Sequence, residues 1–218
     1  MALSAESAQS RQRVARICDS AADARTLRLR LLDEIQQAIG FDSHAWLLTD
    51  PQTSVGSAPL ADVPCLPELP RLIRLKYLTD INRWTTLRSP PVALLREVTA
   101  GDLSRSLLWR DLLSGYGVVD VASLVFRDRF GCWGFLDLWR AGTSARFSHD
   151  EAGWLGDITG PVTTALRRSQ AHAFVVGASA AAPRPGPVVL LLSAGLDVLG
   201  QTPETQEYLR AQIGRAHV

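Results

Sequence analysis

The sequence predicts an α+β domain in which an antiparallel sheet is flanked by helices, and three features carry this prediction. Residues 23–39 repeat apolar side chains at helical spacing. Residues 118–126 and 132–140 are apolar runs rich in β-branched and aromatic side chains, separated by a short loop, which is typical of a β-hairpin. A second amphipathic helix is expected from residue 148 to about residue 168.

Two helices are expected at the start of the chain. Apolar residues recur every four positions from Leu27 to Ile39. Asp23 can cap this helix because its side-chain oxygen can accept from the free N–H groups of the first turn, and Gly40 can end it because glycine tolerates a left-handed backbone. Residues 8–18 predict a shorter helix ahead of it.

The middle of the chain predicts one hairpin and a long irregular connection. Residues 43–49 indicate a strand, and residues 55–58 indicate its hairpin partner. Prolines are then expected to interrupt regular structure, at positions 59, 64, 67 and 70. Helical segments are predicted at 69–78 and 103–114. Because so long a connection in a compact domain is usually functional or disordered, and this one is rich in apolar residues, we expect a lid.

Alternation along residues 132–140 predicts how this strand divides its side chains between two faces. One face is expected to hold Trp133, Phe135, Asp137 and Trp139. The other is expected to hold Gly134, Leu136 and Leu138. The simplest interpretation of the acid between aromatic side chains is that Asp137 faces solvent.

The strongest local signal is the start of a helix at Ser148. Ser148 and Glu151 have the spacing at which each side chain accepts from the backbone N–H of the other, and Phe147 can pack on the first turn. His149 is therefore interpreted as a solvated first-turn residue. Gly160–Pro161 is expected to kink the helix.

Composition changes toward the C-terminal end of the chain. We assign residues 1–172 to a first domain and residues 173–187, rich in alanine, proline and glycine, to a linker. Residues 188–212 are expected to begin a second domain, with a hairpin at 188–193 and 198–200. This piece is too small to bury a core of its own, so the second domain is expected to be truncated.

The last residues suggest where the native sequence ends. Thr202–Pro203 predicts the start of a short helix, with threonine as the cap and proline in the first turn. Residues 213–218, IGRAHV, match the translation of a common sequencing adapter. The native sequence is therefore expected to end near Ala211, and His217 carries no functional weight.

Composition argues against several classes of protein. The 218 residues include 23 basic and 22 acidic side chains, so the chain offers no basic surface for binding DNA by itself. Hydrophobic residues at 46% argue against disorder, and the apolar runs are too short to cross a membrane. Three widely separated cysteines and no export leader favour a cytoplasmic location.

The sequence shows no pattern of catalytic or metal-binding residues. Its four histidines lie on unrelated predicted elements, and cysteine and histidine never recur at metal-ligand spacing. Of the three cysteines, only Cys65 is expected to be exposed enough to react, because it lies in the proline-rich segment. We therefore expect no catalytic residue, no metal and no cofactor.

Six tryptophans are the main candidates for a binding site. Each combines a large apolar surface with one N–H donor, which suits a core or the wall of a pocket for a planar ligand. Trp84 lies in the irregular segment beside Asn82 and Arg83, where a lid can close on a ligand. The candidate ligand-binding residues are Trp46, Trp84, Trp109, Tyr116, Phe126, Phe135, Asn82 and Arg83.

The order of these elements from Asp23 to Arg168 resembles a GAF domain. The resemblance rests on the Trp133–Gly134 step in a strand, Arg140 near its end, the Phe147–Ser148 turn, and a helix of the form ExxxLxxIxxxVxxAL over residues 151–166. It implies an antiparallel sheet flanked by helices, with a cup between the sheet and the variable middle of the chain.

A narrower resemblance concerns residues 64–87, PCLPELPRLIRLKYLTDINRWTTL, which look like the sensor part of actinobacterial helix-turn-helix regulators of the LuxR type. Residues 188–210 are similar to the opening of a PAS-like segment. The resemblance implies a non-catalytic regulatory domain that senses a small molecule and contacts DNA only through a C-terminal domain absent from this chain. It also implies a homodimer, formed through residues 8–18 and 148–168.

Two alternatives stay open. The domain can be a GAF scaffold used only for dimerisation or protein interaction. It can also be a GAF-type methionine sulfoxide reductase, for which Cys65 is the only accessible candidate, although the three cysteines fit that family's spacing poorly.

Overall fold

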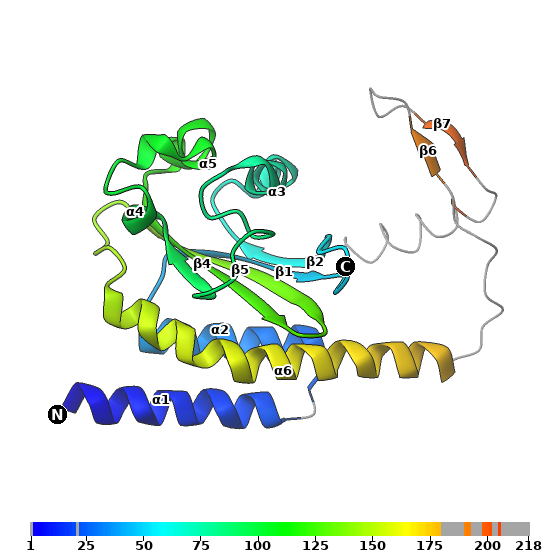
Figure 1. The fold of residues 1–218 in the computed structure, drawn as a ribbon, viewed down its shortest axis with the longest axis horizontal. Coiled ribbons are helices and arrows are strands. Elements are labelled where there is room, and N and C mark those ends of the chain that lie inside the picture. The colour runs from blue at the N-terminus through cyan, green and yellow to red at the C-terminus, as the bar shows by residue number, and fades with distance from the viewer. Residues whose placement is uncertain (1, 21, 180–189, 193–197, 202–204, 206–218) are drawn as a thin grey trace. The chain divides into compact units, whose positions relative to one another are not determined.

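The computed structural model describes residues 2–20, 22–179, 190–192, 198–201 and 205. Its contacts divide the chain into two units, Met1–Ala173 and Phe174–Val218. In the first unit, a five-stranded antiparallel sheet of order β2-β1-β5-β4-β3 lies between two layers of helices (Figure 1). The α+β fold class predicted from the sequence is confirmed.

The described part of the second unit is a two-stranded antiparallel sheet formed by β6 (Leu190–Leu192) and β7 (Val198–Gln201). These strands agree with the predicted hairpin. The predicted helix at Thr202–Pro203 and the tail at 213–218 lie outside the described residues.

On one face of the sheet lie α2 (Ala24–Ala38) and α6 (His149–Ser179), and α1 (Ala2–Asp19) packs on their outer side (Figure 1). Asp23 caps α2 as predicted, because its carboxylate accepts from the N–H groups of Arg25 and Thr26 at 2.9 and 3.0 Å. The helix α6 contains Pro161 and continues past the predicted end at residue 168, so the first part of the predicted linker is helical.

The core beneath these helices is apolar. Trp46 of β1 stacks on Phe126 of β4 with ring centroids 5.2 Å apart, and both side chains are fully buried. Leu31 of α2 and Leu155 of α6 belong to the same buried cluster. Removing this apolar surface from water is the main force that holds the helical layer to the sheet.

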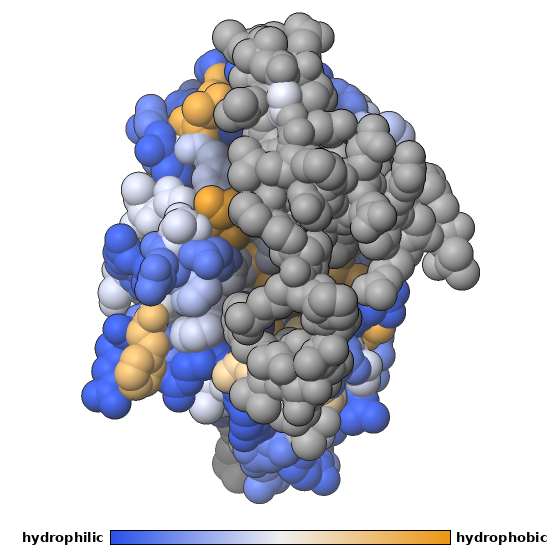
Figure 2. Space-filling model, turned by 90° about the vertical axis from the view of Figure 1, so that its right-hand side faces the viewer, coloured by the Kyte–Doolittle hydropathy of each residue, from blue (hydrophilic) through white to orange (hydrophobic). Residues whose placement is uncertain are grey.

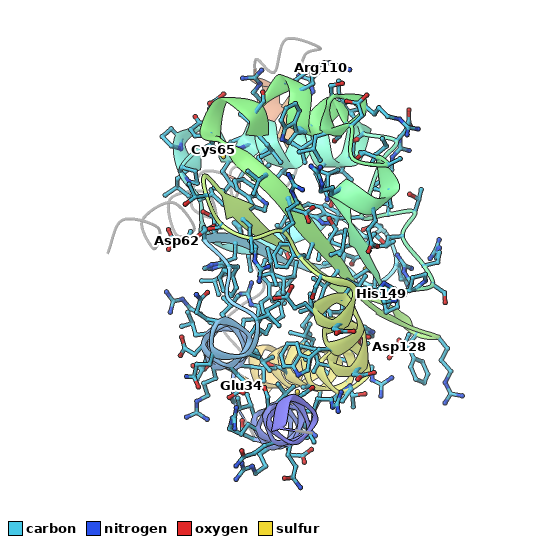
Figure 3. All side chains as sticks on the ribbon, turned by 90° about the vertical axis from the view of Figure 1, so that its left-hand side faces the viewer. Glu34, Asp62, Cys65, Arg110, Asp128 and His149 are labelled. Carbon is cyan, nitrogen blue, oxygen red and sulfur yellow. The ribbon has the colours of Figure 1, made fainter. Side chains whose placement is uncertain are left out.

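Polar contacts hold α1 against α2. Glu34 of α2, which Figure 3 labels, accepts from Ser10 Oγ at 2.7 Å and from Arg13 Nε at 2.9 Å. On the face that Figure 2 presents, hydrophilic side chains cover most of the visible described surface, and hydrophobic ones form small separate patches. None of the helices in the described part of the chain has the length and apolar character needed to cross a membrane.

The sheet consists of β1 (Ser43–Thr49), β2 (Gly56–Asp62), β3 (Val92–Leu94), β4 (Val118–Asp128) and β5 (Gly131–Ala141). The predicted interruption at Pro59 is wrong, because β2 continues through this residue. Since β2 is an edge strand, the missing N–H of a proline can be accommodated on its unpaired side.

A second set of short helices lies on the other face of the sheet (Figure 1): Leu66–Glu68, α3 (Leu69–Leu78), α4 (Leu95–Val98), Leu103–Arg105, α5 (Leu107–Asp111) and Leu113–Tyr116. The helix predicted over 103–114 is therefore broken into three pieces. Ser106 restarts it, because its side chain accepts from the N–H of Trp109 and caps α5. Gly117 ends the last turn in a left-handed conformation, with φ of 64°.

The predicted division of faces along β5 is correct for Phe135 and Trp139 but wrong for Trp133. The register shifts between the Phe126–Gly134 and Arg127–Cys132 pairs, so Trp133 is the extra residue of a β-bulge. Trp133 consequently joins the cluster beneath the helices, with Leu136 and Leu138.

Arg140, near the end of β5, contacts the residues that follow α2 and the first turn of α6. Its guanidinium donates to Glu151 Oε1 at 2.7 Å, to the carbonyl of Gly40 at 3.0 Å, and to the carbonyl of Ile39. Glu151 also accepts from the N–H of Ser148 at 2.6 Å, and Ser148 Oγ accepts from the N–H of Glu151, which confirms the predicted capping box. The side chain of His149 is 93% exposed, as predicted.

We predict that Arg140→Met lowers the free energy of unfolding by about 3 kcal/mol or more, because it leaves Glu151 and the carbonyl groups of Ile39, Gly40, Ala145 and Arg146 without their buried cation. Urea-induced unfolding measures the change. The matched control is Arg11→Met, which removes an ion pair to Asp157 whose side chains are 41% and 56% exposed, and costs less than about 1 kcal/mol. Equal losses in the two variants would contradict this account of Arg140.

Candidate functional site

The candidate site lies on the sheet face opposite α1, α2 and α6. We call the space between this face and α3, α5 and residues 79–91 the cup; Figure 3 shows that side chains fill this part of the molecule. Residues 79–91 form neither helix nor strand. The central strand β5 contributes the side chains of three alternate residues to the floor of the cup, namely Phe135, Asp137 and Trp139.

A lysine and an aspartate meet in the middle of the cup. Lys76 Nζ of α3 lies 3.0 Å from Asp137 Oδ2 of β5, and each side chain is only 2% exposed. Lys76 also donates to Ser123 Oγ of β4 at 2.8 Å, and the indole N–H of Trp84 donates to Asp137 Oδ1 at 2.9 Å. We call these four side chains the polar cluster. They come from α3, β4, β5 and the 79–91 segment.

Aromatic rings enclose the polar cluster on one side. Trp84 stacks on Phe135 with ring centroids 5.1 Å apart and an interplanar angle of 6°. Tyr77 packs edge-on against both rings, at 6.2 and 6.5 Å. The Lys76 ammonium lies 5.2 Å from the centre of the Trp84 ring, a distance at which a cation and an aromatic face attract each other.

Burial governs the electrostatics of the polar cluster. Desolvation lowers the pKa of the Lys76 ammonium, against the attraction of Asp137, which raises it. An unpaired charge at this depth would lower the stability of the fold by several kcal/mol. The contacts of Lys76 to Asp137 and Ser123 are therefore needed to stabilise the buried ammonium.

The expectation that Asp137 faces solvent is wrong. Its strand β5 lies in the centre of the sheet, and α3 and the 79–91 segment supply partners that cover the carboxylate. One neighbour on the same floor has no such partner: the Nε1 atom of Trp139, whose side chain is 1% exposed, makes no hydrogen bond.

The structure brings two of the candidate ligand-binding residues, Trp84 and Phe135, together at the polar cluster. Trp46 and Phe126 lie on the opposite face of the sheet, in the core beneath the helices. The candidate group is therefore split between two faces.

The remaining candidates lie at the margins of the cup. The indole N–H of Trp109 donates to the carbonyl of Val118 at 2.8 Å, and Tyr116 donates to Glu68 at 2.7 Å. Asn82 donates to the carbonyl of Ala93 at 3.3 Å. Arg83 pairs with Asp80 at 2.8 Å, at the outer side of the segment that carries Trp84.

Asn82 and Arg83 also line a surface groove of about 320 Å³, together with Thr86, Leu87, Pro90, Val92, Ala93, Leu94, Glu97 and Val98. Asn82 and Arg83 precede Trp84 closely in the sequence, and Thr86 and Leu87 follow it. The groove thus places solvent-accessible space next to the segment that closes the cup.

Sequence reasoning missed Lys76, Ser123 and the role of Asp137. Lys76 follows Leu72 by one helical turn, so a cation occupies a position of the apolar stripe of α3. It is also the only lysine of the chain. A charged residue at an apolar position of a predicted helix, together with an acid between aromatic residues of a predicted strand, is the signal that the sequence contains.

The cysteines differ from expectation. Cys65 is fully buried rather than exposed, and desolvation raises the pKa of its thiol. Cys18 and Cys132 are buried as well. The exposed thiol that a sulfoxide-reductase activity would use is therefore absent from the described residues, and these contain no group of three His, Cys, Asp or Glu side chains suited to a metal ion.

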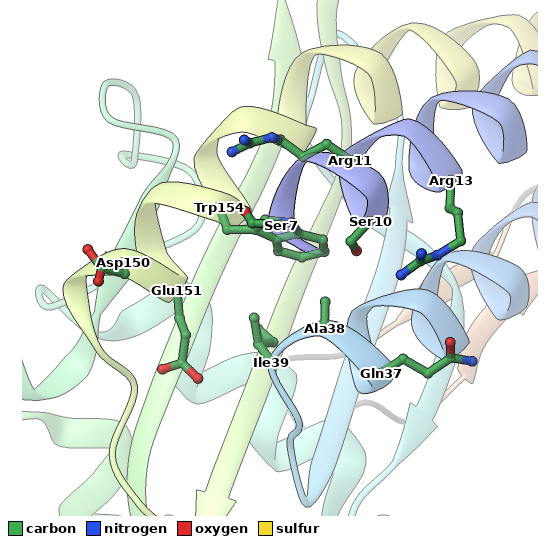
Figure 4. Close-up of a pocket in the computed structure, with 10 residues that line it drawn as sticks. All are labelled: Ser7, Ser10, Arg11, Arg13, Gln37, Ala38, Ile39, Asp150, Glu151 and Trp154. Carbon is green, nitrogen blue, oxygen red and sulfur yellow. The ribbon is translucent and has the colours of Figure 1, made fainter. Parts of the chain in front are cut away.

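A second cavity, of about 590 Å³, lies within the helical layer between α1, the end of α2 and the start of α6 (Figure 4). Arg11 and Arg13 line it from α1, and both are engaged in ion pairs, with Asp157 and Glu34. Trp154 contributes a ring whose Nε1 atom is buried without a hydrogen-bond partner.

No protein-family model and no curated protein matches the chain. Among solved structures, it is similar to the N-acylhomoserine lactone dependent LuxR family transcription factor CepR2 from Burkholderia cenocepacia. That match has a TM-score of 0.56 and 17% identity, over 77% of this chain and 99% of the other. The GAF domain of a two-component sensor histidine kinase from Bacillus halodurans gives a TM-score of 0.49 and 12% identity, over 70% of this chain and 99% of the other.

At these identities the likeness concerns the fold alone. The five-stranded antiparallel sheet with helices on both faces is the α+β architecture predicted from the sequence.

We predict that Asp137→Asn lowers the free energy of unfolding by about 3–5 kcal/mol, because it leaves the Lys76 ammonium buried beside a neutral amide. The double variant Lys76→Met/Asp137→Leu should lose less than Asp137→Asn alone, since it removes both buried charges. Urea-induced unfolding measures all variants, with the exposed Asp157→Asn as the control. If Asp137→Asn costs less than about 1 kcal/mol, the ion pair is not an interior constraint.

Proposed function

We propose that the first unit is a non-catalytic sensory domain that binds a small molecule in the cup. The observation that carries the proposal is the polar cluster, in which a fully desolvated ion pair is closed over by an aromatic ring from an irregular segment. A ligand that takes over the contacts of Trp84 would favour a state in which the 79–91 segment is displaced. Such a difference in affinity between two states is what a sensor requires.

The composition of the cup favours sensing over a purely structural role. A scaffold used only for assembly gains little from a buried ion pair, because well-packed apolar residues of similar volume are often as stabilising or more so. The polar cluster supplies the few convergent polar groups within apolar walls that small-molecule sites typically contain. The unpartnered N–H of Trp139 on the same floor is a donor that a ligand can satisfy.

We further propose that this sensor belongs to a transcription regulator. Residues 1–172 form the sensor and residues 173–187 the linker, while residues 188–212 begin a PAS-like segment. DNA contacts belong to a separate C-terminal domain. Dimerisation uses residues 8–18 and 148–168.

The resemblance of residues 64–87 to the sensors of LuxR-type regulators supports this context, as does the similar fold of a LuxR family transcription factor. The natural sequence beyond Ala211 tests it: a basic helix-turn-helix is expected there.

A thermal-shift screen of metabolites against the wild-type protein tests ligand binding. A compound present at 100 times its Kd should stabilise the domain by about 2.7 kcal/mol. For each compound that binds, Trp84→Phe should raise the affinity at least tenfold. The variant lacks the hydrogen bond to Asp137 that the compound must otherwise displace. Trp46→Phe, which alters a buried ring on the opposite face, should leave the affinity within about twofold.

Two results would contradict the proposal. The absence of any stabilising compound would favour the scaffold alternative. Equal effects of Trp84→Phe and Trp46→Phe on a bound compound would place its site outside the cup.

A further inference from the structure

Lys76 is unusual in both composition and position. Among the 23 lysine and arginine residues of the chain it is the only lysine. It is also among the largest fully buried side chains, and its amine lies within hydrogen-bond distance of a carboxylate and a hydroxyl group.

Lysine and arginine differ in the chemistry that they permit at such a position. A guanidinium stays protonated in proteins, whereas a lysine amine can give up its proton and then acts as a nucleophile. Desolvation lowers the pKa of Lys76, and Asp137 Oδ2, 3.0 Å away, is placed to receive the proton. Transfer of that proton within the pair frees the amine and leaves no unpaired charge in the site.

We propose that Lys76 captures an apolar aldehyde or ketone as an imine, and that this covalent adduct is the ligand-bound state of the cup. The inference rests on the proposed sensory function and specifies the chemical class of its ligand. The ion pair and its two hydrogen-bonded neighbours carry it.

The reaction balances without any further reagent. The Lys76 ammonium passes its proton to Asp137, and the free amine attacks the carbonyl carbon to form a C–N bond. The amine proton moves to the former carbonyl oxygen and gives a carbinolamine. Asp137 then protonates the hydroxyl group, which leaves as water while the nitrogen lone pair forms the C=N bond. The product is an iminium ion paired with the Asp137 carboxylate, so the net charge of the site is unchanged.

The neighbours of Lys76 define what the carbonyl compound must look like. Ser123 Oγ, which already accepts from Lys76 at 2.8 Å, is placed to hydrogen-bond the carbinolamine oxygen. The apolar clusters on this face of the sheet include Phe135 and Leu72, and Trp84 vacates the space beside Lys76 when its segment moves. Since Asp137 already neutralises Lys76, the polar cluster offers no net positive charge to a carboxylate. An aliphatic or aromatic carbonyl compound therefore fits better than an oxo acid.

Entry requires movement of the 79–91 segment, because Lys76 is only 2% exposed. The groove lined by Asn82, Arg83 and Leu87 belongs to the segment that carries Trp84 and gives a carbonyl compound a place to dock before Trp84 is displaced. Formation of the imine at Lys76 of α3 is thus coupled to displacement of the 79–91 segment.

The test uses the full chain with benzaldehyde or butanal, each with sodium cyanoborohydride, which reduces an imine to a stable secondary amine. Peptide mapping by mass spectrometry locates the adduct without ambiguity, since the only primary amines are Lys76 and the N-terminus. We expect native protein to be modified at Lys76 at least ten times faster than at the N-terminal amine, and Asp137→Asn to slow the Lys76 reaction at least tenfold. Arg11→Met, which lies on the opposite side of the sheet, should leave the rate unchanged.

The wild-type result decides the matter even if Asp137→Asn fails to fold. Modification only at the N-terminus, or at Lys76 only after denaturation in urea, would overturn the inference. Benzyl alcohol and butanol serve as matched compounds without a carbonyl group. If they raise the melting temperature as much as the aldehydes and no Lys76 adduct forms, the sensory function stands and covalent capture is wrong.

Discussion

The ion pair between Lys76 and Asp137 is the constraint on which the arrangement of the cup depends. Two charges without water are stable only when each has a partner at close range, and here those partners come from different elements. Lys76 must reach down from α3, Ser123 must face up from β4, and Trp84 must turn inward from the 79–91 segment. An otherwise irregular stretch of chain is thereby fixed by contacts to the centre of the sheet.

The two faces of the sheet differ in what they bury: one covers an apolar core, and the other holds the polar cluster. On the face toward α1, α2 and α6, Trp46 and Phe126 stack within an apolar core, and Arg140 ties the end of β5 to neighbouring segments. On the other face, alternation along β5 places a carboxylate between two aromatic side chains. The same strand therefore serves both layers, and a change in the cup acts on a sheet whose other face holds the helices proposed to form the dimer.

The sequence predicted those elements whose signals are local. The capping box at Ser148, the cap at Asp23 and the paired strands β4 and β5 are encoded by neighbouring residues, and the structure confirms them. The bulge at Trp133 depends on register against another strand, and no local pattern reveals it. The interruption predicted at Pro59 is wrong because edge position is a property of the whole sheet, which no local pattern encodes.

The site was less predictable because it is assembled from distant residues. The irregular surroundings of Trp84 make it a candidate, but its partner Asp137 lies 53 positions away, and the role of Asp137 depends on which strand is central. Trp46, Phe126 and Phe135 all carry aromatic rings on strands, and only the three-dimensional register separates the first two from the third. The lone lysine was visible in the composition, whereas its burial beneath α3 was not.

Hydrogen exchange of the Trp84 indole N–H, followed by ¹⁵N NMR, tests most directly whether the ion pair holds the 79–91 segment in place. The comparison is between the wild type and Lys76→Met/Asp137→Leu, with the Trp109 indole N–H as the internal reference because it donates to the Val118 carbonyl instead. The account predicts that Trp84 exchange accelerates at least tenfold in the variant while Trp109 exchange is unchanged. Equal acceleration at both sites, or none at Trp84, would contradict it.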